Sequence, residues 1–160
     1  MRLVPEDPLS SPHMSESLHV VCPHCDAVNR VPAAKLSAGG HCGICHKLLF
    51  EGRPISLDAA RFERHLGRSD IPLLVDFWAQ WCGPCRVMAP AFERSARRLE
   101  PMMRLVKIDV DREHALAQRF GVRSIPTIVL AFHGRELDRV AGSLSEADLV
   151  SWALRHQAHT

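Results

Sequence analysis

The sequence lacks both a long apolar run and a marked excess of charge of either sign. Its 20 Lys and Arg residues nearly balance 18 Asp and Glu residues, giving a net charge of +2 at pH 7. Proteins that bind nucleic acid carry a clustered basic footprint, so the balance argues against a nucleic-acid partner. The apolar runs are far shorter than the roughly 18 residues of a membrane span, which argues against a membrane partner.

No cysteine falls outside a short pair motif. All six lie in Cys-x-x-Cys pairs, at Cys22/Cys25, Cys42/Cys45 and Cys82/Cys85. In a secreted protein these pairs could be three disulfides, whereas in the reducing cytoplasm they indicate metal binding or thiol chemistry. The first 14 residues contain three prolines, two acidic residues and no apolar core, and do not resemble a secretory signal. We therefore expect a cytoplasmic protein.

The composition changes twice along the chain. Residues 1–17 are rich in Pro and Ser and are expected to be a flexible leader, or a cloning-derived segment with Met14 as the natural start. Residues 18–52 are dense in cysteine and turn-forming residues, and are too few to fold without a cross-link. Residues 53–160 are the right length for one small domain with its own core.

The apolar pattern of residues 53–160 predicts an α/β domain. A helix capped by Asp58 comes first, followed by a buried strand at 73–78. Further strands are expected at 104–110, 127–132 and 136–141, and further helices at 82–99, 113–120 and 145–156. Pro90 is expected to kink the helix that contains it. From residue 73 onward the order is βαβαββα, with mixed strand directions.

A strand is expected to end, and a helix to begin, at the motif Trp81-Cys82-Gly83-Pro84-Cys85. The free N–H groups and dipole of a helix N-terminus stabilise an anion, so a thiol there loses its proton more readily. Pro84 fits the first helical turn because it has no N–H to leave unpaired. We predict that Cys82, the exposed member, attacks a substrate disulfide and that Cys85 resolves the mixed disulfide. A structural disulfide or half of a metal site is the alternative.

A carboxyl group and an amine are candidates for proton handling near this motif. Asp76 interrupts the otherwise apolar strand that leads into the motif, and burial would raise the pKa of its carboxyl group. Lys107, on a neighbouring strand, could pair with it. The alternatives are that Asp76 is a surface carboxylate on an edge strand and that Lys107 is an ordinary solvated lysine.

Several motifs in residues 54–160 resemble the thioredoxin family. They are Asp76-Phe77-Trp78-Ala79, Trp81-Cys82-Gly83-Pro84-Cys85, Lys107-Ile108-Asp109-Val110, Phe120-Gly121-Val122, Ser124-Ile125-Pro126-Thr127, Gly134 and Val140-Ala141-Gly142. The resemblance implies a thioredoxin fold, in which a central mixed β-sheet is flanked by helices. It also implies that Pro126 is cis and faces the dithiol, and that the substrate surface comprises Trp81, Gly83, Pro84, Ile125, Ala141 and Gly142. Arg86 and Ser124 depart from the common family residues without threatening the activity.

The first two cysteine pairs predict a zinc ribbon over residues 18–52. Cys22/Cys25 and Cys42/Cys45 are separated by 16 residues, and four thiolates match the tetrahedral preference of one structural zinc ion. Zinc would supply the folding free energy that the segment lacks. Three alternatives stay open: a histidine ligand from His24, His41 or His46, two redox-active disulfides, and a nucleic-acid ribbon. The nucleic-acid ribbon is disfavoured because residues 18–52 contain only three basic residues against two acidic ones.

A zinc ribbon followed by this dithiol domain resembles the zinc-containing thioredoxin 2 group of bacteria. The resemblance implies a cytoplasmic, monomeric protein-disulfide reductase that is recharged by an NADPH-dependent thioredoxin reductase and connected with oxidative stress. Gly83-Pro84 argues against an oxidase or isomerase. A different function is a redox-sensing zinc module, in which oxidation of the four ribbon thiolates releases zinc and exposes a partner surface.

Overall fold

Strands β1 (Ser17–Val21) and β2 (Val28–Pro32) pair antiparallel and begin the part of the chain that the structure, a computed structural model, describes, residues 17–156. Ser17 therefore belongs to β1, and the other sixteen residues of the expected leader lie outside the described range. A 3₁₀ turn at Ala33–Lys35 follows β2. The ribbon predicted for residues 18–52 thus contains one short two-stranded sheet.

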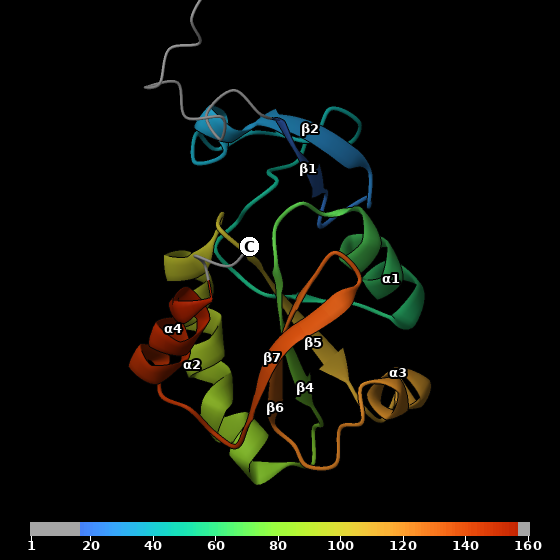
Figure 1. Cartoon of the computed structure of the whole chain (residues 1–160), viewed down its shortest axis with the longest axis vertical. Helices are drawn as coiled ribbons and strands as arrows, with labels where there is room; N and C mark the ends of the chain where they lie inside the picture. The colour runs from blue at the N-terminus through green and yellow to red at the C-terminus, as the bar shows by residue number, and fades with distance from the viewer. Residues whose placement is uncertain (1–16, 157–160) are drawn as a thin grey trace, which may run out of the picture.

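A five-stranded mixed sheet forms the centre of the second part of the chain (Figure 1). Its order is β3 (Ile55–Ser56), β5 (Arg104–Asp109), β4 (Leu73–Trp78), β6 (Thr127–Phe132) and β7 (Arg135–Ala141). The first three strands are parallel, and β6 and β7 pair antiparallel to their neighbours. Mixed directions were predicted, but β3 was missed because two residues are too few to show a periodicity.

The α-helices of residues 17–156 cover the sheet: α1 (Ala59–Arg68), α2 (Gly83–Leu99), α3 (His114–Arg119) and α4 (Glu146–Arg155). The Asp58 carboxylate accepts the N–H of Arg61 at 2.8 Å and so caps α1 as predicted. Pro90 lies inside α2 without ending it. Within residues 17–156, none of the helices combines the length and apolar character needed to cross a membrane.

Alternate residues of β4 face opposite layers of the core, because successive side chains of a strand point to opposite faces. Leu73, Val75 and Phe77 pack with residues of α1 and α3, whereas Leu74 packs with residues of α2 and α4. Asp76 therefore lies on the Leu74 face, toward α2. The sheet alternation explains why a carboxyl group in an apolar run faces the helix that carries the cysteines.

The ribbon contacts the end of the sheet at which β4 and β5 begin. The Asp70 N–H donates to the His19 carbonyl at 2.8 Å, and the Arg104 guanidinium donates to the Val21 carbonyl at 3.2 Å. In Figure 1, β1 and β2 lie at the top of the molecule, whereas α2 begins at the bottom. The ribbon and the first turn of α2 are thus at opposite ends of the sheet.

Candidate active site and metal centre

Cys82 and Cys85 are joined by a disulfide at the start of α2, with their Cα atoms 5.3 Å apart. Cys82 is the N-cap residue of the helix, and its Sγ accepts the backbone N–H of Cys85 at 3.2 Å. Cys82 Sγ also lies 3.6 Å from the carbonyl oxygen of Ile125. The helix N-terminus therefore directs an N–H group at the sulfur that sequence analysis assigned as the nucleophile.

The two cysteines do not differ in exposure as expected. Cys82 was predicted to be the exposed member, but in the disulfide form it is 4% exposed and Cys85 is 2% exposed. The reason is that Cys82 packs in a small apolar cluster with Ala79 and Cys85, against which Ile125 is also packed. What distinguishes Cys82 is its N-cap position and its proximity to the Ile125 backbone.

Two parts of the expected substrate surface, the cis-proline loop and the end of β7, lie side by side. The Ile125–Pro126 peptide bond is cis, as the resemblance implies, and the Pro126 carbonyl accepts the Gly142 N–H at 2.9 Å. Ala141 pairs with Thr127 across β6 and β7, which places the end of β7 beside this loop. Gly142 has a φ of +97°, a conformation that favours glycine.

Trp81 projects into solvent beside the disulfide. Its side chain is 68% exposed, and its indole N–H donates to the Asp111 carboxylate at 2.9 Å. Trp81 and Ile125 line one wall of a cavity of about 350 Å³ that extends toward α3. Sequence analysis missed Asp111, because nothing about an acidic residue after a strand indicates that it accepts a hydrogen bond from an indole N–H.

Asp76 is almost completely buried. It is 1% exposed, and one carboxylate oxygen, Oδ1, has no hydrogen-bond partner within the described residues. Burial raises the pKa of its carboxyl group to about 7, and the positive charge of Lys107 opposes that rise. The alternative of an exposed carboxylate on an edge strand is therefore wrong, because β4 lies between β5 and β6.

Lys107 lies opposite Asp76 in the register of β4 and β5. Its ammonium group sits 4.3 Å from the centroid of the Trp78 ring, a cation–π contact. The positive charge of Lys107 lowers the pKa of the Asp76 carboxyl group without a side-chain hydrogen bond between the two. Lys107 thus acts on Asp76 through its charge rather than through a direct contact.

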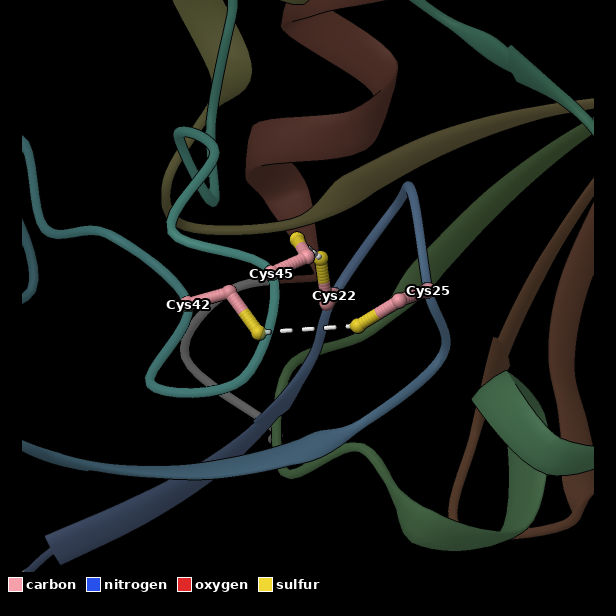
Figure 2. A group of neighbouring side chains, drawn as sticks. All are labelled: Cys22, Cys25, Cys42 and Cys45. Atoms are coloured by element: carbon pink, nitrogen blue, oxygen red, sulfur yellow. Dashed lines mark hydrogen bonds between the residues drawn. The ribbon is translucent and has the colours of Figure 1, made fainter.

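The four ribbon cysteines converge on one point (Figure 2). Their sulfur atoms all lie within 4.8 Å of one another, and the Cys22–Cys45 and Cys25–Cys42 pairs are 3.6 Å apart. Four sulfurs that each bind zinc at about 2.3 Å lie about 3.8 Å from one another. The arrangement fits a zinc ion held entirely by protein ligands, with no position left for a substrate.

The two cysteine knuckles of the ribbon repeat the same backbone geometry. The N–H groups of His24 and Ile44 each point at the first sulfur of their own knuckle, at 3.4 Å from Cys22 Sγ and Cys42 Sγ. Asp26 and His46, each four residues after that first cysteine, adopt positive φ angles of 62° and 65°. Such N–H···S contacts stabilise thiolates, which are the form that binds zinc.

Other side chains around the cluster complete its surroundings. The amide of Asn29 donates to Cys42 Sγ at 3.5 Å, and its oxygen accepts the Gly43 N–H at 2.9 Å. Sequence analysis missed Asn29, because a lone Asn in a strand does not indicate a sulfur contact. The His24 ring pairs with the Glu51 carboxylate, and the group that could hold a metal ion consists of the four cysteines without His24.

Burial raises the pKa of the Cys22 thiol to about 12. The thiol is therefore protonated at neutral pH unless a cation stabilises the thiolate. Zinc binding at the cluster therefore displaces this proton.

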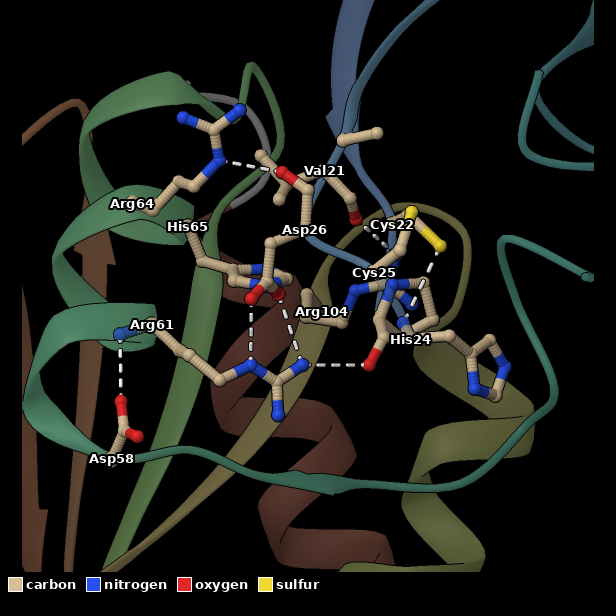
Figure 3. A network of polar contacts seen from close by, with 12 residues as sticks. Val21, Cys22, His24, Cys25, Asp26, Asp58, Arg61, Arg64, His65 and Arg104 are labelled. Atoms are coloured by element: carbon tan, nitrogen blue, oxygen red, sulfur yellow. Dashed lines mark hydrogen bonds and ion pairs between the residues drawn. The ribbon is translucent and has the colours of Figure 1, made fainter. Parts of the chain in front are cut away.

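An ionic network fastens the first knuckle to α1 (Figure 3). The Arg61 guanidinium contacts both oxygens of Asp26, at 2.8 and 2.9 Å, and also donates to the Pro23 carbonyl at 2.9 Å. His65, 1% exposed, places Nε2 3.0 Å from Asp26 Oδ1. Asp26 directly follows the metal-ligand candidate Cys25, so the knuckle and the dithiol domain share a polar interface.

Arg104 is the second anchor of the ribbon. It is 2% exposed and lies 3.5 Å from Glu100 and 4.3 Å from the centroid of the Phe50 ring, in addition to its bond to the Val21 carbonyl. Neither Arg61 nor Arg104 was predicted to contact the ribbon. A charged residue at the start of the apolar stretch Arg104–Val110 was unusual enough to be noticed. Nothing in the sequence, however, indicated that it contacts the ribbon.

Two family profiles match the chain. The thioredoxin profile covers residues 53–155, and the profile of the thioredoxin 2 N-terminal zinc ribbon covers residues 21–47. The first contains the Cys82/Cys85 disulfide and the cis-proline loop, and the second contains all four cysteines of the metal cluster. The profiles therefore coincide with the two sites that the structure assembles.

Individual relatives agree with the profiles. Thioredoxin C-3 of Corynebacterium nephridii is 42% identical over 133 residues, or 83% of this chain and 91% of that protein. Two solved structures cover the dithiol domain. The Malassezia sympodialis thioredoxin is 30% identical, covers 71% of this chain and 98% of its own, and has a TM-score of 0.62. A mutant thioredoxin of Halobacterium salinarum is 31% identical, covers 68% of this chain and 94% of its own, and has a TM-score of 0.61. The chain therefore belongs to the thioredoxin family of thiol–disulfide oxidoreductases and carries the amino-terminal ribbon of its thioredoxin 2 type.

Proposed function

We propose that the chain reduces disulfide bonds in proteins. The observation that carries this proposal is the Cys82–Cys85 disulfide at the N-terminus of α2, with the Cys85 N–H on Cys82 Sγ and the Ile125 carbonyl beside it. A helix N-terminus stabilises the Cys82 thiolate once the pair is reduced. The backbone at Ile125, beside Cys82 Sγ, is suited to pairing with an extended segment of the substrate.

The reaction proceeds by two successive thiolate attacks. The Cys82 thiolate attacks one sulfur of the substrate disulfide, so that a mixed disulfide forms and the other substrate sulfur leaves as a thiolate. The Cys85 thiol then loses its proton and attacks Cys82 Sγ. This step releases the second substrate thiolate and leaves the Cys82–Cys85 disulfide, so two electrons pass from the protein to the substrate.

Asp76 accepts the proton of Cys85 in the second step. A carboxyl group with a pKa of about 7 is matched to proton transfer at neutral pH, because both of its forms are populated. Lys107 keeps that pKa from rising further. Pro126 shapes the loop opposite the dithiol, and Trp81, Gly83, Pro84, Ile125, Ala141 and Gly142 form the surface on which the substrate rests.

The partners and the metal follow from the same proposal. An NADPH-dependent thioredoxin reductase returns two electrons to the disulfide. The ribbon holds one zinc ion on Cys22, Cys25, Cys42 and Cys45, and the ion serves as a structural cross-link. The protein works as a monomer in the cytoplasm, where a reducing thiol pool suits both the thiolates and the reductase activity.

Reduction of insulin with NADPH and thioredoxin reductase tests the proposal. The chain should support steady NADPH oxidation and insulin precipitation, and Cys82→Ser should abolish both. Cys25→Ser or Cys42→Ser should leave the reaction of the Cys82/Cys85 pair in place, because those cysteines belong to the metal cluster. A Cys82→Ser protein with near-normal turnover would overturn the assignment of the nucleophile.

A further inference from the structure

The exposed side of α2 changes character along its length. Its first turns expose apolar residues at three-residue intervals, namely Pro84, Val87 and Pro90, which we call the α2 strip. Arg86 is also exposed in these turns, and the later exposed positions are all charged, namely Glu93, Arg94, Arg97 and Arg98. The apolar part of the exposed face is therefore the part that lies next to the dithiol.

Val87 is the least expected member of the strip. Its side chain is 75% exposed, and a β-branched residue at an exposed helical position contributes neither packing nor favourable helix propensity. Five large apolar side chains are exposed in residues 17–156, and two of them, Trp81 and Val87, flank the Cys82/Cys85 pair. Sequence analysis did not select Val87.

The strip continues into a shallow groove. Ala89 and Pro90 form its apolar part, and Arg86, Glu93 and Arg94 surround them. Helical rise places Val87 about 7.5 Å along α2 from Cys82. The strip and groove are thus continuous with the surface around the reactive sulfur, on the side of Cys82 that α2 provides.

We propose that the α2 strip, with Val87 at its centre, is a docking surface for the protein whose disulfide is reduced. The inference rests on the proposed function, since it names a further contact of that same site. A protein–protein contact covers about 800 Å² on each partner, a patch roughly 30 Å across. A contact of that size centred on Cys82 Sγ extends about 15 Å from it and includes Val87, whereas a small disulfide covers only a fraction of that area.

The docked protein places an apolar side chain against Val87. Removing this contact weakens association of the protein substrate and leaves the thiol chemistry intact, because Val87 is not part of the apolar cluster that contains the two cysteines. Val87 is thus a specificity-determining residue that separates protein disulfides from small ones.

Comparison of two disulfides of very different size tests the proposal. Stopped-flow measurements give the rate constants of the reduced protein with insulin and with 5,5′-dithiobis(2-nitrobenzoate). Val87→Ser should lower the rate constant for insulin by about fivefold and leave that for the small disulfide unchanged. Val87→Leu should restore the insulin rate. Leu154→Ser, which changes a 39% exposed residue on α4, is the matched control and should not affect either rate.

Each other result counts against the proposal. A Val87→Ser protein that reduces insulin at the wild-type rate shows that the strip does not dock substrate, and equal slowing with both disulfides shows an effect on the cysteines themselves. Slowing of the reductase step alone assigns the strip to the reductase. If the unmodified chain does not reduce insulin, the proposed function itself fails, which is a separate outcome. Melting temperatures establish that the variants fold, as exposure of Val87 predicts.

Discussion

The Arg61 guanidinium binds the Asp26 carboxylate through two contacts, Nε to Oδ2 at 2.8 Å and Nη2 to Oδ1 at 2.9 Å. The pair joins α1 to the residue that follows the metal-ligand candidate Cys25. Both side chains are partly buried, at 33% and 22% exposure. A bidentate pair with restricted access to water is stronger than an ordinary surface ion pair.

Arg61→Ala should therefore loosen the ribbon from α1. The change leaves Asp26 with His65 and removes the donor to the Pro23 carbonyl, so we expect the free energy of unfolding of the zinc-loaded protein to fall by about 1–2 kcal/mol. Urea unfolding followed by tryptophan fluorescence measures the change. Arg112→Ala, at an 86% exposed side chain 3.9 Å from Asp109, is the control and should have little effect. Equal stability of the two variants would show that the Asp26 contacts do not hold the ribbon.

Asp76 should make the stability of the oxidised protein depend on pH. Burial raises the pKa of its carboxyl group from 3.8 to about 7, against the opposing charge of Lys107. Between about pH 4 and pH 7 the folded protein keeps a proton that the unfolded chain releases. The stability that protonated Asp76 contributes is therefore complete below pH 4 and is lost as the pH rises to 7, by about 4 kcal/mol.

Asp76→Ala isolates this contribution. Relative to the unmodified protein, the variant should gain stability as the pH rises from 4 to 8, because it has no buried carboxylate to ionise. Denaturant unfolding at several pH values between 4 and 8.5 measures the difference. A constant offset between the two proteins over that range would mean that the pKa of Asp76 is not raised.

Cys85→Ser should accumulate mixed disulfides, because Cys82 can still attack a substrate but nothing resolves the product. After mixing with insulin, non-reducing electrophoresis should show an adduct that a reductant cleaves, whereas Cys82→Ser should show none. In the same assay with both cysteines present, Asp76→Ala should slow the second step more than the first. Equal slowing of both steps would remove its role as the proton acceptor.

The order of strands and helices from residue 73 onward was predictable because each element is long enough to show its own periodicity. Ile55–Ser56 carries no such signal, and only pairing with β5 makes it a strand. The cap of α1 was also predictable, since the Asp58 carboxylate accepts the N–H three residues ahead. Local hydrogen bonds can be inferred from local sequence.

The sites were predictable to the extent that their chemistry is local. The cysteine spacings identify both centres, and Asp76 stands out because a carboxyl group in an apolar strand is unusual. The contacts of Arg104 with the Val21 carbonyl and Phe50 join residues more than fifty positions apart, and no pattern within either segment indicates the other. The exposure of Cys82 was wrongly predicted in part for the same reason, since the distant residues Val110 and Ile125 pack against its cluster.

Native mass spectrometry of the full chain, purified without chelator, tests most directly whether four cysteines bind the metal and two form the redox pair. The mass reports bound metal and disulfide count in the same spectrum. We predict one zinc ion and at most one reversible disulfide, which assigns Cys22, Cys25, Cys42 and Cys45 to the metal and leaves Cys82 and Cys85 as the redox pair. A reduced chain without metal, or a metal-free chain with three disulfides that still forms the folded ribbon, would contradict the account.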